Sequence, residues 1–283
     1  MSIAEHVGVV RTVVMRDLAQ VTALLEADPI ENCFVASRVR AGGTDPWRLG
    51  GELLGYFDGD RLVSMLYLGA NLAPVAATPA TIAAFADRLR RAPRRCSSFV
   101  GRSEEVLELW RLLEPAWGDA REVRQRQPLM AIDHESPVAP DPRLRRARPE
   151  DLGILVPACI DMFTGEVGVS PVAMGGRSAY EARVAELVAA GRAYAVIEDG
   201  EVVFKAEVGA IGEGVCQVQG VWVAPRLRGR GLAAGCMAAL VGQVRREHAP
   251  VVSLYVNDFN TAARKAYLAA GFAEVGTFAT VLF

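Results

Sequence analysis

The stretch "VWVAPRLRGRGLAAG", from Val221 to Gly235, joins β-favouring residues to an apolar run with helical spacing. We therefore expect a strand, a glycine-rich turn and a helix. Gly229 and Gly231 allow unusual backbone angles and the close approach of a ligand. The first N–H groups of a helix lack partners inside the helix and attract anions, and the arginines of the turn add positive charge. The stretch predicts a phosphate-binding turn, and a surface turn with solvated arginines is the alternative.

Two common classes of phosphate-binding protein do not fit this turn. "GRGLAA" satisfies a relaxed dinucleotide-binding fingerprint, but that fold needs several parallel strands after the turn and an acid about 20 residues further on. Only two strands are expected after Ala234. A nucleoside-triphosphate loop ends in GK[ST], which is absent. We therefore exclude dinucleotide-dependent, kinase and ATPase functions.

The residues on both sides of the turn predict an α/β arrangement. Asn260 is expected to cap a helix that Gly271 ends. The second half of the chain is expected to contain strands near 193–198, 202–208 and 251–256, a strand ending at 225, and helices near 150–162, 178–190, 232–244 and 261–270.

A proline-rich segment divides the chain nearly in half. Three prolines fall close together in "DHESPVAPDPRL", from Asp133 to Leu144. The halves also share a weak repeat, because "FDGDRLVSMLYLGA" in the first matches "EDGEVVFKAEVGA" in the second as a hairpin. The expected organisation is a first domain over 1–135, a linker over 136–143 and a second domain over 144–283. Two unrelated domains with ordinary hairpins are the alternative.

Two motifs resemble the GNAT superfamily of acyl-CoA-dependent N-acyltransferases. "VWVAPRLRGRGLA" is similar to the motif in which a strand leads into R/Q-x-x-G-x-G/A. "VNDFNTAARKAYLAAGF" is similar to the segment N-x-x-A-x-x-x-Y-x-x-x-G-F, through Asn260, Ala263, Tyr267, Gly271 and Phe272. The resemblance implies two tandem GNAT-like domains of actinobacterial type, each a mixed, mostly antiparallel twisted sheet flanked by helices. The first of these domains would be degenerate.

The resemblance also implies acetyl-CoA as co-substrate. In the family a bulge separates the strand before the turn from the next strand, so that the pantetheine arm lies between them. The implied acetyl-CoA-binding residues are Val221, Trp222, Val223, Arg228, Gly229, Arg230, Gly231, Leu232, Ala233, Ala234, Asn257, Asn260, Ala263 and Tyr267.

The resemblance implies only part of a set of catalytic residues. Tyr267 matches the tyrosine that protonates the coenzyme thiolate, and a tyrosine that only packs in a helix face is the alternative. Some members carry a glutamate as general base where this chain has Gln217, whose amide cannot accept the proton. Glu207 and Glu166 are candidate bases, and the C-terminal carboxylate of Phe283 or a water molecule are alternatives.

The first half lacks the phosphate-binding turn. Its corresponding segment, "GANLAPVAATPATIAAFADRLRRA", has neither glycine nor arginine in the turn, and Pro79 opens the helix. We expect this half not to bind CoA but to complete the acceptor pocket or brace the second half. The arginines from Arg88 to Arg95 are expected to end a helix, where cations are favourable, rather than to bind nucleic acid.

Composition limits the remaining function classes. The net charge of −2 predicts no nucleic-acid partner, and no apolar run reaches the ~18 residues of a membrane span. Five scattered cysteines without a CxxC pair indicate a cytoplasmic protein without a metal site. We expect an N-acetyltransferase that acylates a small-molecule or peptide amine directly, with a pocket shaped by the loop 164–176. A CoA-binding regulatory protein without turnover and an N-acyltransferase for longer chains are alternatives, and the oligomeric state is not indicated.

Overall fold

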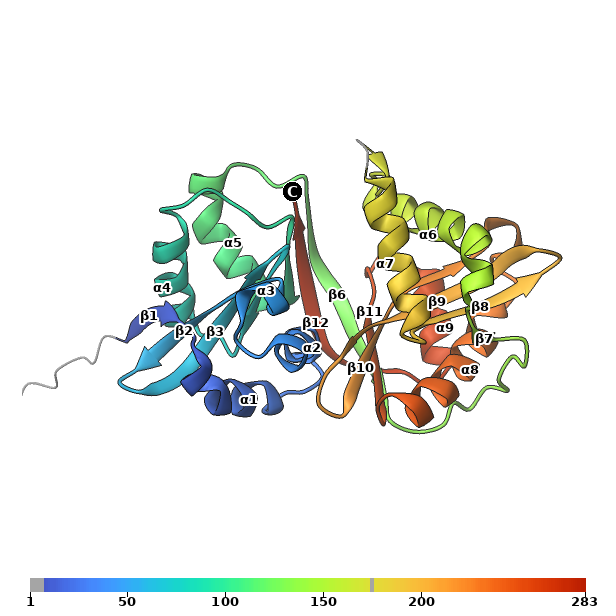
Figure 1. Ribbon diagram of the computed structural model, residues 1–283, viewed down its shortest axis with the longest axis horizontal. Coiled ribbons are helices and arrows are strands. Elements are labelled where there is room, and N and C mark those ends of the chain that lie inside the picture. The colour runs from blue at the N-terminus through green and yellow to red at the C-terminus, as the bar shows by residue number, and fades with distance from the viewer. Residues whose placement is uncertain (1–7, 174–175) are drawn as a thin grey trace, which may run out of the picture. The chain divides into compact units, whose positions relative to one another are not determined.

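The computed structural model describes residues 8–173 and 176–283 of the chain (Figure 1). The chain forms two compact units, and neither is continuous in sequence. The first contains residues up to Leu129 together with Tyr255–Asp258 and Glu274–Phe283, and the second contains Met130–Leu254 and Phe259–Ala273. Each unit has a mixed, mostly antiparallel sheet flanked by helices, so the expected fold class is confirmed.

The strands of the first unit include one from the far end of the chain. In spatial order they are β1 (Val9–Thr12), β2 (Gly51–Asp58), β3 (Arg61–Gly69), β4 (Asn71–Val75), β5 (Ser98–Arg102), β12 (Ala273–Leu282) and β6 (Glu122–Ile132). β4 and β5 are parallel, whereas β12 runs antiparallel to β5 from Phe278 opposite Arg102 to Leu282 opposite Ser98. β12 therefore completes the sheet of the first unit.

Helices cover both faces of this sheet because its strands are apolar on both sides. Leu53 and Leu54 are neighbours in β2, yet they belong to different hydrophobic clusters, since successive strand side chains point to opposite faces. The Leu53 cluster includes residues of α1 (Leu18–Glu26), α2 (Cys33–Gly42) and α3 (Pro46–Leu49). The Leu54 cluster includes residues of α4 (Pro79–Leu89) and α5 (Ser103–Trp117).

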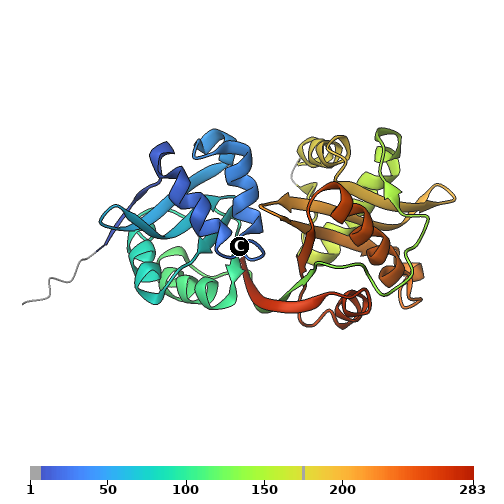
Figure 2. The same ribbon diagram turned by 90° about the horizontal axis from the view of Figure 1, so that it is seen from below.

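The second unit repeats this arrangement around the predicted turn. Its strands lie in the order β11 (Val251–Tyr255), β10 (Val215–Val223), β9 (Glu201–Ile211), β8 (Ala193–Glu198) and β7 (Arg145–Arg146). β10 and β11 are parallel, and the other neighbours are antiparallel. The helices α6 (Leu152–Val167) and α7 (Arg177–Ala189) pack on one face and α8 (Leu232–Glu247) on the other, while α9 (Thr261–Ala269) precedes β12 (Figure 2).

The expected elements of the second unit are present, with two differences. α6 continues to Val167, beyond the expected end at 162, and stops where Gly168 takes a left-handed conformation and donates to Thr164. The expected linker 136–143 lies within the second unit, where the N–H of Asp141 donates to the carbonyl of Gly235 at 2.9 Å. Of the apolar stripe expected on α8, Leu232 is half-buried, and Cys236, Met237, Leu240, Val241 and Val244 are buried.

Candidate functional site

β10 is paired with β11 over only part of its length. The parallel pairing runs from Val215 opposite Val251 to Gln217 opposite Ser253, whereas β10 continues along β9 as far as Val223. After β11 the chain pairs within the first unit, where the Val256 N–H donates to the carbonyl of Pro128 at 3.2 Å. Among the described residues, no strand follows this edge of β10 beyond Gln217. The backbone edge over 221–223 is therefore suited to an extended ligand that adds to the sheet.

A β-bulge lies in the part of β10 that is paired with β9 but not with β11. The register with β9 passes from Gln219 opposite Glu207 to Trp222 opposite Lys205, so β10 contains one extra residue. Gly220, in this bulge, has a φ of +60°, which L side chains rarely adopt. A bulge of this kind bends its strand and increases the local twist. This is the feature that the GNAT resemblance implied for this strand.

The predicted turn follows β10 and ends at the N-terminus of α8. Gly229 has a φ of +74° and Gly231 a φ of +79°, so both need the conformational freedom of glycine. A Cβ atom at either position would meet nothing within 4 Å, which leaves the turn open to a ligand. Among the described residues, no side chain caps the first turn of α8, whose half-buried residues are Leu232, Ala233 and Ala234. The unpartnered N–H groups of this turn form an anion-binding geometry.

The three arginines of the turn have different environments. Arg226 forms an ion pair with Glu201 rather than only meeting solvent. The Nε of Arg228 donates to the carbonyl of Val223 at 3.1 Å, which ties its exposed side chain to the end of β10. Arg230 forms no ion pair among the residues that the structure describes, and it borders a cavity. The charge of Arg230 is therefore available to a bound anion at the cavity, and the charge of Arg228 is not neutralised by its hydrogen bond to a carbonyl.

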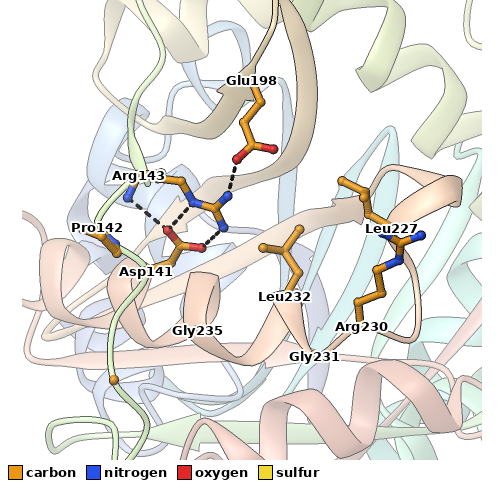
Figure 3. A pocket seen from close by; sticks show the side chains of 10 residues that line it. Asp141, Pro142, Arg143, Glu198, Leu227, Arg230, Gly231, Leu232 and Gly235 are labelled. Atoms are coloured by element: carbon orange, nitrogen blue, oxygen red, sulfur yellow. Dashed lines mark hydrogen bonds and ion pairs between the residues drawn. The ribbon is translucent and has the colours of Figure 1, made fainter.

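The cavity beside the turn has a volume of about 500 Å³ (Figure 3). On one side Arg143 binds Asp141, through an Nε–Oδ1 distance of 2.9 Å, and Glu198. The guanidinium of Arg143 holds the pKa of Asp141 below its ordinary value. Figure 3 shows Arg230 and Leu227 on the other side, away from this cluster. The charges of Arg143 are compensated, so that side of the cavity is not a strong anion site.

Tyr267 lies in α9 and is 6% exposed. Burial raises the pKa of Tyr267 above its ordinary value, and the negative charge of Glu166 raises it further. Glu166 lies at the exposed end of α6, close enough for its charge to act on Tyr267. The phenol stays protonated at neutral pH, as a proton donor must, although a tyrosine packed against Phe272 for structural reasons would also be protonated.

The two asparagines predicted beside the pantetheine arm differ. Asn260 caps α9, since its Oδ1 accepts from the N–H of Ala263 at 3.2 Å, and the predicted cap is confirmed. Asn257 belongs to the first unit, where its Oδ1 accepts from Nε2 of Gln127 at 2.9 Å. The oxygen of Asn257 is therefore engaged within that unit.

Glu207 is buried beside a lysine that the sequence interpretation missed. Nζ of Lys205 forms an ion pair with Glu207 and donates to Sγ of Cys159 at 3.2 Å. Burial lowers the pKa of Lys205, but the charges of Glu207 and Cys159 and the hydrogen bonds to both together outweigh burial, so the pKa of Lys205 lies above its ordinary value. Burial raises the pKa of Cys159 to about 11, which keeps this thiol protonated. The sequence contains one indication that Lys205 is unusual, because it is one of two lysines in the chain and lies in an apolar strand.

Gln217 occupies the position of the family glutamate. It is buried, and its Nε2 has no hydrogen-bond partner among the described residues. An amide donor cannot accept a proton from an amine, so Gln217 is not a general base. Of the two carboxylates predicted for this role, Glu166 is exposed and Glu207 is held by Lys205.

The corresponding place in the first unit has a different lining. β4 pairs with β5 only through Asn71 and Leu72, but a Cβ at Gly101 would lie 3.6 Å from Cδ of Pro74. Pro74 also lacks an N–H to offer. The turn to α4 is short, and its Ala77 N–H donates to the buried carboxyl of Glu105 at 3.2 Å. These contacts agree with the expectation that this half does not bind CoA, which stays a prediction.

Family models match both parts of the chain. Residues 166–272 match the Acetyltransferase (GNAT) family, and residues 51–155 match a domain of unknown function, DUF4081. No curated protein matches the sequence. None of the described helices is long and apolar enough to cross a membrane, and the described residues contain no cluster of metal-ligating side chains.

Solved structures with the same fold match this chain over nearly its whole length. A GCN5-related N-acetyltransferase from Sphaerobacter thermophilus is 20% identical with a TM-score of 0.63, and the match covers 99% of this chain and 96% of that one. A GNAT-family acetyltransferase from Colwellia psychrerythraea is 14% identical with a TM-score of 0.58, and 97% and 99% are covered. A tandem GNAT protein from the clavulanic acid biosynthesis pathway is 15% identical with a TM-score of 0.54, and 96% and 98% are covered. The chain therefore has the tandem GNAT fold, and its residues 166–272 match the model of the GNAT acetyltransferase family.

Proposed function

We propose that the second unit transfers an acetyl group from acetyl-CoA directly to an amine. One observation carries this proposal: a single segment of chain holds an unpaired strand edge, a bulge, a glycine-rich turn and an uncapped helix N-terminus. The strand edge suits the amide-containing arm of CoA, and the bulge suits the thioester. The glycine-rich turn and the helix N-terminus together suit the pyrophosphate. The match of residues 166–272 to the GNAT family supports acyl transfer in general.

In this proposal the phosphate groups of acetyl-CoA bind the turn from Arg228 to Ala234. The backbone N–H groups at the start of α8 donate to the pyrophosphate, and Arg230 adds charge from the cavity wall. The pantetheine arm follows the backbone of 221–223. Asn260 and Ala263, at the start of α9, border the arm as the family resemblance implies.

The chemistry needs a neutral amine, a donor for the developing oxyanion and a proton for the departing thiolate. A backbone N–H of the bulged strand is the proposed oxyanion donor. Tyr267 is the proposed proton donor, because its raised pKa keeps it protonated. Glu166 is the accessible carboxylate that could receive the amine proton directly or through water, and Glu207 is the buried alternative.

The acceptor in this proposal is a small-molecule or peptide amine. We expect the segment 164–176 to shape its pocket, although its residues 164–167, including Glu166, form the end of α6 and not a loop. Positions 174 and 175 of the loop lie outside the described residues.

Calorimetry with acetyl-CoA tests the proposed binding site. Gly231→Glu places a negative charge at the pyrophosphate position and is expected to weaken binding at least about tenfold. Gly214→Glu is the matched control, since Gly214 also has a positive φ, of +66°, and open space around it, but lies in the turn before β10. Equal affinity of the wild type and Gly231→Glu would show that the turn does not bind CoA.

A CoA-binding protein without turnover is a second candidate, and Gln217 at the position of a family base favours it. Acetyl-CoA binding without thiol release across a broad panel of amines would support this candidate. Competition between acetyl-CoA and longer acyl-CoA thioesters tests the chain-length alternative. Tighter binding of the longer thioesters would make a longer acyl-CoA, and not acetyl-CoA, the proposed substrate.

A further inference from the structure

The ion pair of Lys205 and Glu207 is unusually enclosed for two charged side chains. Lys205 is 1% exposed and Glu207 is 7% exposed. Cys159, from α6, completes the cluster, with its Sγ 3.5 Å from Oε1 of Glu207 and 3.2 Å from Nζ of Lys205. Removing two charges from water is costly even when they pair, and apolar residues of similar size are often as stable. Stability alone therefore gives little reason for an ion pair at this position.

The cluster lies directly beneath the bulge of β10. Lys205 and Glu207 are the β9 residues opposite the two ends of the bulge, at Trp222 and Gln219. A Cβ at Gly220 would lie 3.2 Å from Nζ of Lys205 and 3.4 Å from Cδ of Glu207. The ion pair therefore fills the space into which a side chain at position 220 of the bulge would project.

The cluster fills the space on the inner side of the bulge. A Cβ added at Gly220 would lie 3.2 Å from the ammonium nitrogen of Lys205 and 3.1 Å from Cε of Met162. The φ of +60° at Gly220 is therefore combined with a filled space, unlike that of Gly229, around which nothing lies within 4 Å. A fixed charge in a region of low dielectric also acts strongly on nearby backbone dipoles.

We infer that Lys205 is a positioning residue: together with Glu207 it holds Gly220 and Val221 in the bulged conformation that presents the β10 backbone to the thioester. This inference rests on the proposed function. It makes Glu207 the partner of Lys205 and leaves Glu166 as the carboxylate candidate for the general base. No contact between Lys205 and substrate is required.

The test compares Lys205→Met with the double variant Lys205→Met/Glu207→Leu, in which neither charge remains. Lys265→Met is the matched control, because Lys265 is the other lysine of the chain and is exposed on α9. Glu207→Gln is the milder variant should Lys205→Met fail to fold. The measurements are the thermal midpoint, the affinity for acetyl-CoA, the rate of thiol release from acetyl-CoA with water or amines as acceptor, and the ¹H–¹⁵N shifts of Gly220 and Val221 without ligand.

The double variant is expected to recover the thermal midpoint that Lys205→Met loses. It is expected to release thiol at least about tenfold more slowly than the wild type. Its affinity for acetyl-CoA is expected to stay within about threefold of the wild type, since the turn is unchanged. The shifts of Gly220 and Val221 are expected to change, while those of Val215 to Gln217 do not. Lys265→Met should match the wild type in every measurement.

Wild-type thiol release in the double variant, or unchanged shifts at Gly220 and Val221, would overturn the inference. Failure of the proposed function gives a different result: the wild type itself then releases no thiol. In that case the two amide shifts still decide whether Lys205 holds the bulge.

Discussion

The Oγ1 of Thr280, in β12, donates a hydrogen bond to Oε1 of Gln127, in β6, across 153 residues of sequence. Their distance is 2.5 Å, and both side chains are buried. Gln127 in turn donates to Asn257, so that three segments distant in sequence share one buried polar network in the first unit. Such a network specifies which strands are neighbours, because any other pairing would leave its polar atoms unsatisfied.

Thr280→Val is therefore expected to destabilise the first unit. Removing the hydroxyl leaves Oε1 of Gln127 buried without this donor, at a cost of about 1–3 kcal/mol in the free energy of unfolding. Urea denaturation measures this cost. Thr277→Val, at a half-buried position of the same strand, is the control and should change stability less. Equal effects of the two substitutions would contradict the importance of the network.

Gly220→Ala is expected to be more destabilising than Gly200→Ala. Both glycines have a positive φ, but a Cβ at Gly200 would meet nothing within 4 Å, whereas one at Gly220 would press on Lys205 and Met162. The additional overpacking is expected to cost about 1–3 kcal/mol in the free energy of unfolding. Chemical denaturation of the two variants measures the difference. If both variants lose the same stability, the space beneath Gly220 is not filled as described.

Tyr267→Phe is expected to lower kcat by about 10²–10⁴-fold without a comparable loss of acetyl-CoA affinity. The ring and its packing against Phe272 are retained, and only the proton donor is lost. Steady-state kinetics and calorimetry on the same preparation separate the two effects. Unchanged kcat would assign Tyr267 to packing alone. Because its pKa is raised, the wild type should show no loss of activity from Tyr267 at mildly alkaline pH.

Glu105 is expected to make the first unit less stable as the pH rises. Burial raises the pKa of Glu105 from 4.5 to about 7, so the folded protein holds this proton over a range in which the unfolded chain has lost it. The free energy of unfolding therefore falls as the pH rises from about 4.5 to about 7, and the loss is complete above that range.

Glu105→Gln removes this titration, while the amide oxygen can still accept from Ala77. The free energy of unfolding of the variant, measured relative to that of the wild type, is expected to be about 1–3 kcal/mol higher at pH 8 than at pH 5. Denaturant unfolding at the two pH values measures the gain. The same difference at both pH values would mean that Glu105 is already charged at pH 5 in the folded state.

Sequence predicted the local features of the site and missed the contacts between distant segments. The positive φ values of Gly229 and Gly231 and the cap at Asn260 follow from residue types within a few positions, and all three are present. The Lys205 cluster depends on Cys159, 46 residues earlier, and the engagement of Asn257 depends on Gln127, 130 residues earlier. Neither could be derived without knowing which strands and helices are neighbours.

The membership of β12 in the first unit sets an order for synthesis. A ribosome makes β5 long before it makes Glu274–Phe283, and the whole of the second unit is translated in between. Until β12 emerges, the edge of β5 on that side has no strand to pair with and is a place where another chain could add. The first unit begins to be translated first, but it cannot finish folding until the end of the chain is made. A nascent chain stalled after α9 would expose the edge of β5.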